Sequence, residues 1–144
     1  MAAPARRRAA VLGHPIAHSL SPVLHRAAYR HLGLSWSYDA MEVNEAQLPG
    51  VLASLGAEWA GLSLTMPLKE AVLPLLTEVD PEAALLRSVN TVVIDGSQRS
   101  GHNTDVAGLT RVLEGVELDE DASVTVLGAG ATARSATAAL ARLG

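Results

Sequence analysis

The chain has 144 residues, the size of one globular domain, and 15 Asp and Glu residues against 11 Lys and Arg residues give it a formal net charge of -4 at pH 7. This charge has the wrong sign for a protein that neutralises phosphate backbones, and no apolar run approaches the roughly 18 residues that span a bilayer. The absence of Cys excludes a disulfide framework, a thiolate metal site and a cysteine nucleophile. Because the apolar run at residues 9–12 is also too short for a secretory signal, we expect a cytoplasmic protein without nucleic-acid or membrane partners.

The first third of the chain predicts two strands around a helix. Residues 9–12 are apolar and are followed by glycine and proline, which is typical of a short buried strand. A helix is expected to begin at Ser21 and Pro22, because a serine hydroxyl can cap free N–H groups and proline suits the first helical position, and to end at Gly33. Alternating apolar and polar side chains over residues 34–40 predict a strand with one buried face.

The middle of the chain continues this alternation. Residues 49–55 predict a short helix, and residues 61–65 predict a third strand. Pro67 opens a helix that Pro74 must bend or end, and Asp80 with the proline after it begins another. Strands that alternate with helices indicate an α/β fold.

A hairpin and a helix are expected next. Residues 89–94 and 99–102 read as two strands, and the Asp-Gly pair at 95–96 begins the turn between them. Asn103 or Thr104 then caps a helix. The apolar positions of that helix are Val106, Leu109, Val112 and Leu113.

The last part of the chain predicts a glycine turn between a strand and a helix. Residues 123–127 read as the strand, and Gly128 and Gly130 precede a helix that continues to residue 143. Such a turn can hold a pyrophosphate, but glycines also make tight turns without a ligand, and both interpretations stay open. A lone parallel strand has no partner, so we expect a sequence that is cut short and poor anchoring from this strand onward.

Two serines before the first helix form the first candidate site. Ser19 and Ser21 lie where the positive end of a helix begins, so both hydroxyls can receive a carboxylate. The alternative is that Ser21 is only a helix cap and Ser19 a loop residue. His14 and His18 do not form a convincing metal pair, because Pro15 excludes a regular helix between them, and we expect no metal. Surface or partly buried positions are expected for His25, His31 and His102.

The only lysine of the chain, Lys69, lies at a predicted junction between a strand and a helix. Arginine fills every other basic position, so this lysine indicates a need for a group that can release a proton. Asp105 lies in the first turn of its predicted helix, where the helix dipole favours an ionised carboxylate. A surface lysine and a plain capping sequence are the alternatives.

Five segments, in this order, resemble the NADP-dependent shikimate dehydrogenase family: GHPIAHSLSP, SLTMPLKE, SVNTVV, GHNTD and VLGAGATAR. The resemblance implies an α/β fold, in which a substrate-binding domain with a mixed sheet flanked by helices precedes the first strand and helix of a Rossmann dinucleotide-binding domain. It divides the chain into the substrate-binding domain at residues 1–103, a linking helix at 104–116 and an incomplete Rossmann domain at 117–144. The implied reaction is the reversible NADPH-dependent reduction of 3-dehydroshikimate to shikimate.

The resemblance also assigns roles to residues of this sequence. Ser19 and Ser21 look like the pair that binds the substrate carboxylate, and Lys69 and Asp105 look like the catalytic pair. The substrate is further contacted by Ser63, Thr65, Lys69, Asn90 and Asp105. The turn that binds NADP consists of Gly128, Ala129, Gly130, Ala131 and Arg134, where the arginine is associated with the adenosine phosphate. Two positions depart from the family: Ser63, where asparagine is usual and a changed contact is expected, and Ala131, where glycine is usual.

Three other functions stay open. The chain can be a substrate-binding or regulatory module without hydride chemistry, or an enzyme that acts on quinate, a question that Ser63 cannot settle. It can also be an interaction fragment whose exposed apolar helix, residues 131–143, pairs with another chain. Pairing of two copies of this chain in a homodimer also stays open.

Overall fold

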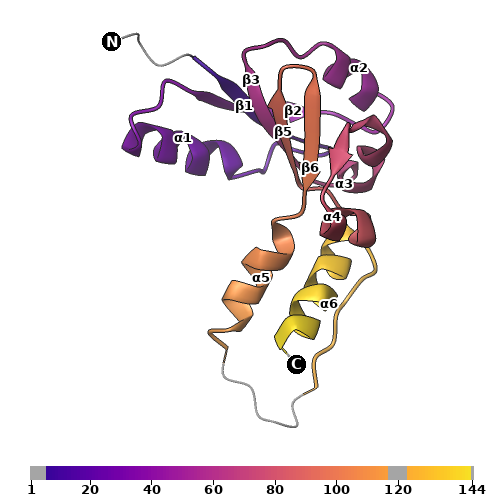
Figure 1. Ribbon diagram of the computed structural model, residues 1–144. Coiled ribbons are helices and arrows are strands. Elements are labelled where there is room, and N and C mark those ends of the chain that lie inside the picture. The colour runs from indigo at the N-terminus through magenta and orange to yellow at the C-terminus, as the bar shows by residue number, and fades with distance from the viewer. Residues whose placement is uncertain (1–5, 117–122, 144) are drawn as a thin grey trace.

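The computed structural model describes residues 6–116 and 123–143. Its centre is a six-stranded mixed sheet with the strand order β2-β1-β3-β5-β6-β4 (Figure 1). The strands are β1 (Arg8–Gly13), β2 (Ser37–Glu42), β3 (Trp59–Leu64), β4 (Glu78–Val79), β5 (Thr91–Asp95) and β6 (Gln98–His102). The helices are α1 (Ser21–His31), α2 (Leu48–Ala53), α3 (Leu68–Ala71), the 3-10 helix η1 (Leu73–Leu75), α4 (Pro81–Leu86), α5 (Asp105–Leu113) and α6 (Ala131–Leu143). The expected α/β fold with a mixed sheet flanked by helices is confirmed.

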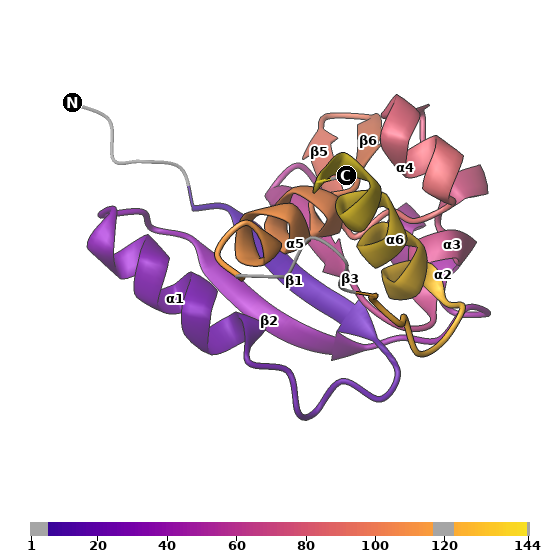
Figure 2. The same cartoon turned by 90° about the horizontal axis from the view of Figure 1, so that it is seen from below.

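Strand β1 is buried on both faces of the sheet. Ala10 and Leu12 belong to the larger core, which includes buried residues of α2, α3 and α4. Ala9 and Val11 face the opposite way and pack with the ring of Tyr38, on the side that α1 covers. Figure 2 shows α1 apart from α2, α3 and α4. Side chains that alternate along a strand thus build two cores from one short apolar run.

The predicted hairpin is confirmed, and a further short strand joins it. β5 and β6 pair in antiparallel fashion on either side of a turn that contains Gly96. The sequence pattern does not predict β4, whose two residues, Glu78 and Val79, pair with Ser100 and Gly101 of β6. Two residues are too few to show an alternating pattern, so this strand is defined only by its pairing with the neighbouring strand.

The starts of the helices follow the sequence signals with one exception. Asp80 caps α4 as expected, and its Oδ1 accepts the N–H of Ala83 at 2.8 Å. The expectation that Ser21 caps α1 is wrong: Ser21 is the first helical residue, and Leu20 before it makes no side-chain cap bond. Instead, Ser19 Oγ accepts the N–H of Ser21 at 3.3 Å. The Ser21 hydroxyl is therefore not used in capping.

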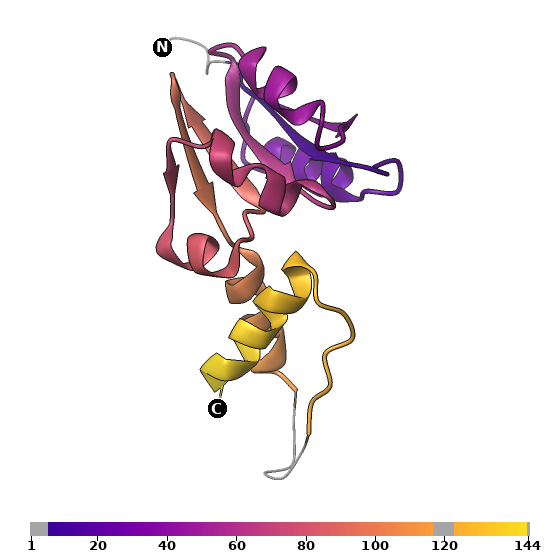
Figure 3. The same cartoon turned by 90° about the vertical axis from the view of Figure 1, so that its right-hand side faces the viewer.

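Helices α5 and α6 lie side by side and project from one end of the sheet (Figures 1 and 3). The strand expected at residues 123–127 is wrong, because no described strand lies beside this segment to share its hydrogen bonds. Poor anchoring is wrong for the helix that follows, since Ser135 and Ala139 of α6 are buried. The interaction-fragment hypothesis expects an exposed helix at residues 131–143, but this helix packs against α5.

The division into domains stays a prediction. α5 lies within the expected linking helix at residues 104–116, whereas residues 117–122 of the expected Rossmann start lie outside the described residues. None of the helices in the described ranges is long and apolar enough to cross a membrane.

Candidate active site

Strand directions bring the candidate residues to one edge of the sheet. β1 and β3 are parallel, so the loops after them, which lead to Ser19 and Lys69, leave the sheet at the same edge. β5 is antiparallel to β3, which places Asn90, just before β5, beside the end of β3. The Leu64 N–H donates to the Asn90 carbonyl at 2.8 Å. The antiparallel β6 then returns to this edge and ends at His102, three residues before Asp105.

A cavity of about 520 Å³ opens at this edge. It is lined by all the residues expected to bind the substrate: Ser19, Ser21, Ser63, Thr65, Lys69, Asn90 and Asp105. Gly13 allows the loop after β1 to approach closely, since a Cβ there would collide with the side chain of Thr65 and the carbonyl of Met66. The structure therefore joins in one polar cavity residues that are widely separated along the chain.

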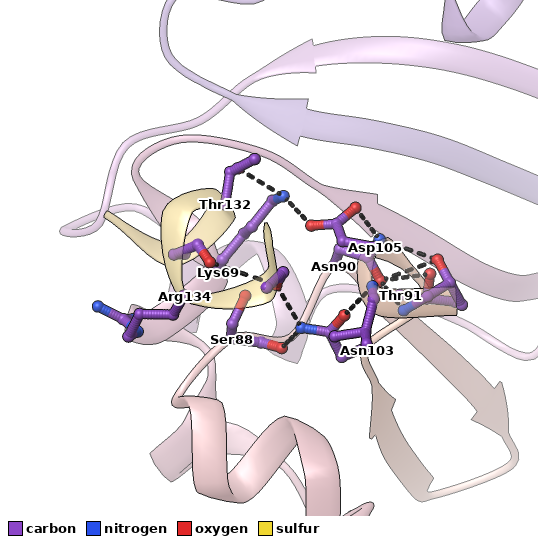
Figure 4. A network of polar contacts seen from close by, with 12 residues as sticks. Lys69, Ser88, Asn90, Thr91, Asn103, Asp105, Thr132 and Arg134 are labelled. Atoms are coloured by element: carbon purple, nitrogen blue, oxygen red, sulfur yellow. Dashed lines mark hydrogen bonds and ion pairs between the residues drawn. The ribbon is translucent and has the colours of Figure 1, made fainter. Parts of the chain in front are cut away.

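An ion pair forms part of the wall of this cavity. Lys69 Nζ donates to Asp105 Oδ2 at 2.5 Å, and the two side chains are only 13% and 23% exposed. Asn90 Nδ2 donates to the other carboxylate oxygen, Oδ1, at 2.7 Å (Figure 4). Charge-assisted hydrogen bonds of this kind are short and strong. They fix the ammonium and the carboxylate in one relative orientation.

The Asn90 amide is itself oriented by the backbone before α5. The Thr104 N–H donates to Asn90 Oδ1 at 2.9 Å, so the amide nitrogen must face Asp105. Asn103 acts as the expected cap, because its Oδ1 accepts the N–H of Val106 at 3.1 Å. The motif that carries Asp105 therefore both starts the helix and orients the residue that holds the carboxylate.

A second cavity, of about 600 Å³, contains the glycine turn. Of the residues expected to bind the cofactor, those that line it are Gly128, Gly130, Ala131 and Arg134, whereas Ala129 does not. Thr65 and Lys69 line both cavities. The Lys69 side chain therefore stands between the polar cavity and the glycine turn.

Sequence reasoning missed three side chains around the site. Tyr38 Oη donates to Ser63 Oγ at 2.7 Å. The changed substrate contact expected at this position, where the family usually has asparagine, stays a prediction. His25 lines the first cavity and stacks on Tyr38, with ring centroids 3.9 Å apart. Lys69 Nζ also donates to Thr132 Oγ1 of α6 at 3.4 Å. Strand alternation assigns Tyr38 only to the core, and no local signal points to the other two.

We expect the Tyr38 hydroxyl to reduce stability at high pH. Burial raises the pKa of Tyr38 above its ordinary value of 10.0, and hydrogen bonds with Ser63 and Ser21 offset only part of this rise. Because the fold favours the protonated phenol, this contribution to stability is complete below about pH 10 and is lost as the pH rises through the folded pKa. The Tm of the wild type should therefore fall more steeply above about pH 10 than the Tm of Tyr38→Phe. Thermal melts over this range check the prediction, and parallel curves for wild type and Tyr38→Phe would contradict it.

Protein groups already engage the guanidinium of Arg134. Its Nε donates to the Leu86 carbonyl at 2.6 Å, and its Nη2 donates to the Arg87 carbonyl and to Glu70 Oε2, both at 2.9 Å. Contact with an adenosine phosphate stays a prediction for this residue.

Hydroxyl, amide, ammonium and carboxylate groups thus surround two adjoining cavities. Within residues 6–116 and 123–143, no group of three or more His, Asp or Glu side chains could hold a metal ion. The family model of the shikimate dehydrogenase substrate binding domain matches residues 11–92. The chain belongs to the shikimate dehydrogenase family.

Relatives of this family resemble the chain over almost all of its length. A shikimate dehydrogenase (NADP(+)) of Methanothermobacter thermautotrophicus is 42% identical over 137 residues, which are 93% of this chain and 48% of the relative. The crystal structure of a Thermus thermophilus shikimate 5-dehydrogenase in complex with NADP(H) and shikimate has a TM-score of 0.86 at 43% identity, and the match covers 96% of this chain and 53% of that one. The Aquifex aeolicus shikimate dehydrogenase has a TM-score of 0.90 at 35% identity, over 100% and 55% of the two chains. The chain spans about half the length of the curated relatives it matches.

Proposed function

We propose that this chain provides the substrate site and the catalytic pair of an NADP-dependent shikimate dehydrogenase, which interconverts 3-dehydroshikimate and shikimate in chorismate and aromatic amino-acid biosynthesis. The observation that carries the proposal is the position of Lys69, whose amine pairs with Asp105 between the polar cavity and the cavity of the glycine turn. A substrate ketone in the first cavity can receive a proton from Lys69 and lies next to the cavity from which a cofactor would deliver the hydride. The Thermus thermophilus relative, which holds NADP(H) and shikimate together, supports this arrangement.

The serines at the start of α1 suit the carboxylate of the substrate. Ser19 Oγ accepts the N–H of Ser21, so its own hydrogen is left to donate, and the Ser21 hydroxyl is not used in capping. The positive end of the 11-residue helix α1 adds to the attraction for an anion. On other parts of the cavity wall, Thr65, Asn90 and Asp105 offer polar partners for ring hydroxyls. An analogue that lacked one hydroxyl would leave a partner unpaired.

Lys69 and Asp105 divide the acid–base work. Reduction of the ketone adds a hydride to the carbon and a proton to the oxygen. Lys69 Nζ donates this proton as negative charge builds on the oxygen, and in the oxidation of shikimate the amine accepts the proton from the hydroxyl. Asp105 orients the ammonium through Oδ2, while its remaining lone pairs can accept a hydrogen bond from a neighbouring substrate hydroxyl.

The glycine turn fits the pyrophosphate of NADP. Gly128 has a φ of +114°, a conformation that side chains disfavour, and open space lies over Gly128 and Gly130, so a ligand can approach the backbone. The residues that would hold the cofactor at the N-terminus of α6 are Gly128, Ala129, Gly130 and Ala131. When bound, NADPH supplies the hydride.

We expect shikimate to bind this chain in the absence of nucleotide. In an NMR titration of the ¹⁵N-labelled chain, shikimate should shift the amide signals of cavity residues, including Ser19, Ser21 and Asn90. Ser21→Ala should weaken binding by about tenfold to a hundredfold, since a hydrogen bond to a charged group contributes about 1.5–3 kcal/mol. The methyl ester of shikimate, which has no charge, should also bind more weakly.

Ser54→Ala is the matched control, because this exposed serine lies at the end of α2 and donates only to the Val51 carbonyl. Its affinity for shikimate should equal that of the wild type. A titration in which no cavity signal moves would overturn the proposed substrate, and tighter binding of quinate would assign the site to quinate. Binding of shikimate without any binding of NADP would favour the substrate-binding module. The homodimer and the cytoplasmic location stay predictions.

A further inference from the structure

Arg134 stands on the helix that follows the glycine turn, yet its guanidinium reaches the segments that build the substrate cavity. The Leu86 carbonyl accepts from Nε at 2.6 Å, and the Arg87 carbonyl and Glu70 Oε2 both accept from Nη2 at 2.9 Å. Its side chain is 34% exposed. One guanidinium thus joins α6 to two segments whose contacting residues precede Arg134 by 47 to 64 residues.

The first of these segments is the end of α4. The last carbonyls of a helix have no partner within the helix, and Arg134 supplies donors for those of Leu86 and Arg87. Arg87 is held in the left-handed conformation with a φ of 48°, which is uncommon for a residue with a side chain. Three residues later comes Asn90, which donates to Asp105. The guanidinium therefore fixes the start of the loop that delivers the Asn90 amide.

The second segment is α3, in which Glu70 directly follows Lys69. The Glu70 carboxylate accepts from Arg87 Nε and from Arg134 Nη2, both at 2.9 Å. The hydrogen bond from Arg87, followed by the weaker contribution of Arg134, holds the pKa of Glu70 below its usual value despite some desolvation, so the carboxylate stays charged at neutral pH. The N–H of Val89 donates to the Lys69 carbonyl at 2.8 Å, which joins the two segments behind the lysine.

We propose that Arg134 is a positioning residue that ties the cofactor helix α6 to the segments carrying Lys69 and Asn90, so that the hydroxyl-binding side of the cavity depends on the docking of α6. The inference rests on the proposed function of this cavity. Arginine suits the role because its planar fork donates in fixed directions to carbonyls and a carboxylate at once, whereas the ammonium of lysine is a compact point charge. Ser19 and Ser21 are not among its hydrogen-bond partners, so the carboxylate-binding side should be independent of it.

The test compares two ligands on the ¹⁵N-labelled chain without nucleotide. Shikimate uses both sides of the cavity, whereas cyclohex-1-ene-1-carboxylate has no hydroxyl and uses only the serines. Arg134→Ala should weaken shikimate binding about tenfold, because the loss of one or two well-placed hydrogen bonds to the ligand has that effect, and should change the affinity for the analogue less than about twofold. Arg134→Lys should show the same changes in affinity as Arg134→Ala. If the alanine variant does not give the spectrum of a folded protein, the two ligands are compared on the lysine variant instead.

Arg142→Ala is the matched control, because Arg142 also lies on α6 and pairs with Glu82 of α4. It should leave both affinities unchanged. An unchanged shikimate affinity in Arg134→Ala overturns the proposal. This result is expected of a residue that contacts only a cofactor phosphate. Equal losses for both ligands, or a selective loss of shikimate in Arg142→Ala, also overturn it. If the wild type binds neither ligand, the proposed function fails first, which separates the two conclusions.

Discussion

Lys69→Ala should lower turnover about 100-fold or more, the usual range for the loss of a general acid or base. Lys69 lines both cavities, and the pair with Asp105 at 2.5 Å holds its amine in place. The loss should appear equally in kcat and kcat/KM, because the contacts through Ser19, Ser21 and Asn90 that bind the ground state remain. Steady-state kinetics of shikimate oxidation with NADP measure this loss. The assay uses a protein that contains this chain and is as long as its relatives.

Lys69→Arg separates the roles of charge and proton transfer. The guanidinium keeps the positive charge, but it does not release a proton near neutral pH and does not fit a site built around an ammonium, so no rescue is expected. A Lys69→Ala variant with a normal kcat and only a raised KM would assign the lysine to binding and leave the proton donor to another group.

Leu68→Ala should destabilise the fold by about 2–5 kcal/mol, the range for truncating a buried leucine. Leu68 is completely buried, belongs to the larger core and directly precedes Lys69. Domains of this size have a free energy of unfolding of about 5–15 kcal/mol, so this substitution removes a large part of the total and loosens the segment that carries the catalytic lysine. Urea denaturation monitored by circular dichroism measures the change.

Leu85→Ala provides the matched control for this substitution, because Leu85 of α4 is 82% exposed. Its free energy of unfolding should differ from that of the wild type by less than about 0.5 kcal/mol. If both variants lost similar stability, packing of Leu68 in the core would not be the cause.

Parts of the candidate site could be inferred from single residues. Lys69 stands out as the only lysine of the chain, and Ser19 and Ser21 carry hydroxyls at the start of a helix. Thr65 and Asn90 carry no such signal, and only the resemblance of longer motifs to the family points to them. The sequence pattern predicts only burial for Tyr38, which donates to Ser63, because strand alternation indicates burial and not the partner of a hydroxyl.

Short-range chemistry explains what the sequence by itself determined. A proline ends a helix, Asp80 caps one and the Asp-Gly pair turns a hairpin because each acts on its own backbone or on neighbours within about four residues. For this reason most helices, the strands β1 to β3 and the hairpin follow from the sequence.

Only the tertiary structure decided which of these elements meet. The antiparallel position of β5 beside β3 brings Asn90 next to the end of that strand, and the docking of α6 brings Arg134 to Glu70, 64 residues earlier in the chain. The same dependence explains why residues 123–127 form no strand despite their apolar pattern, since a strand exists only through hydrogen bonds to a neighbour. Contacts between distant segments depend on which surfaces pack together, and no local pattern of side chains encodes that choice.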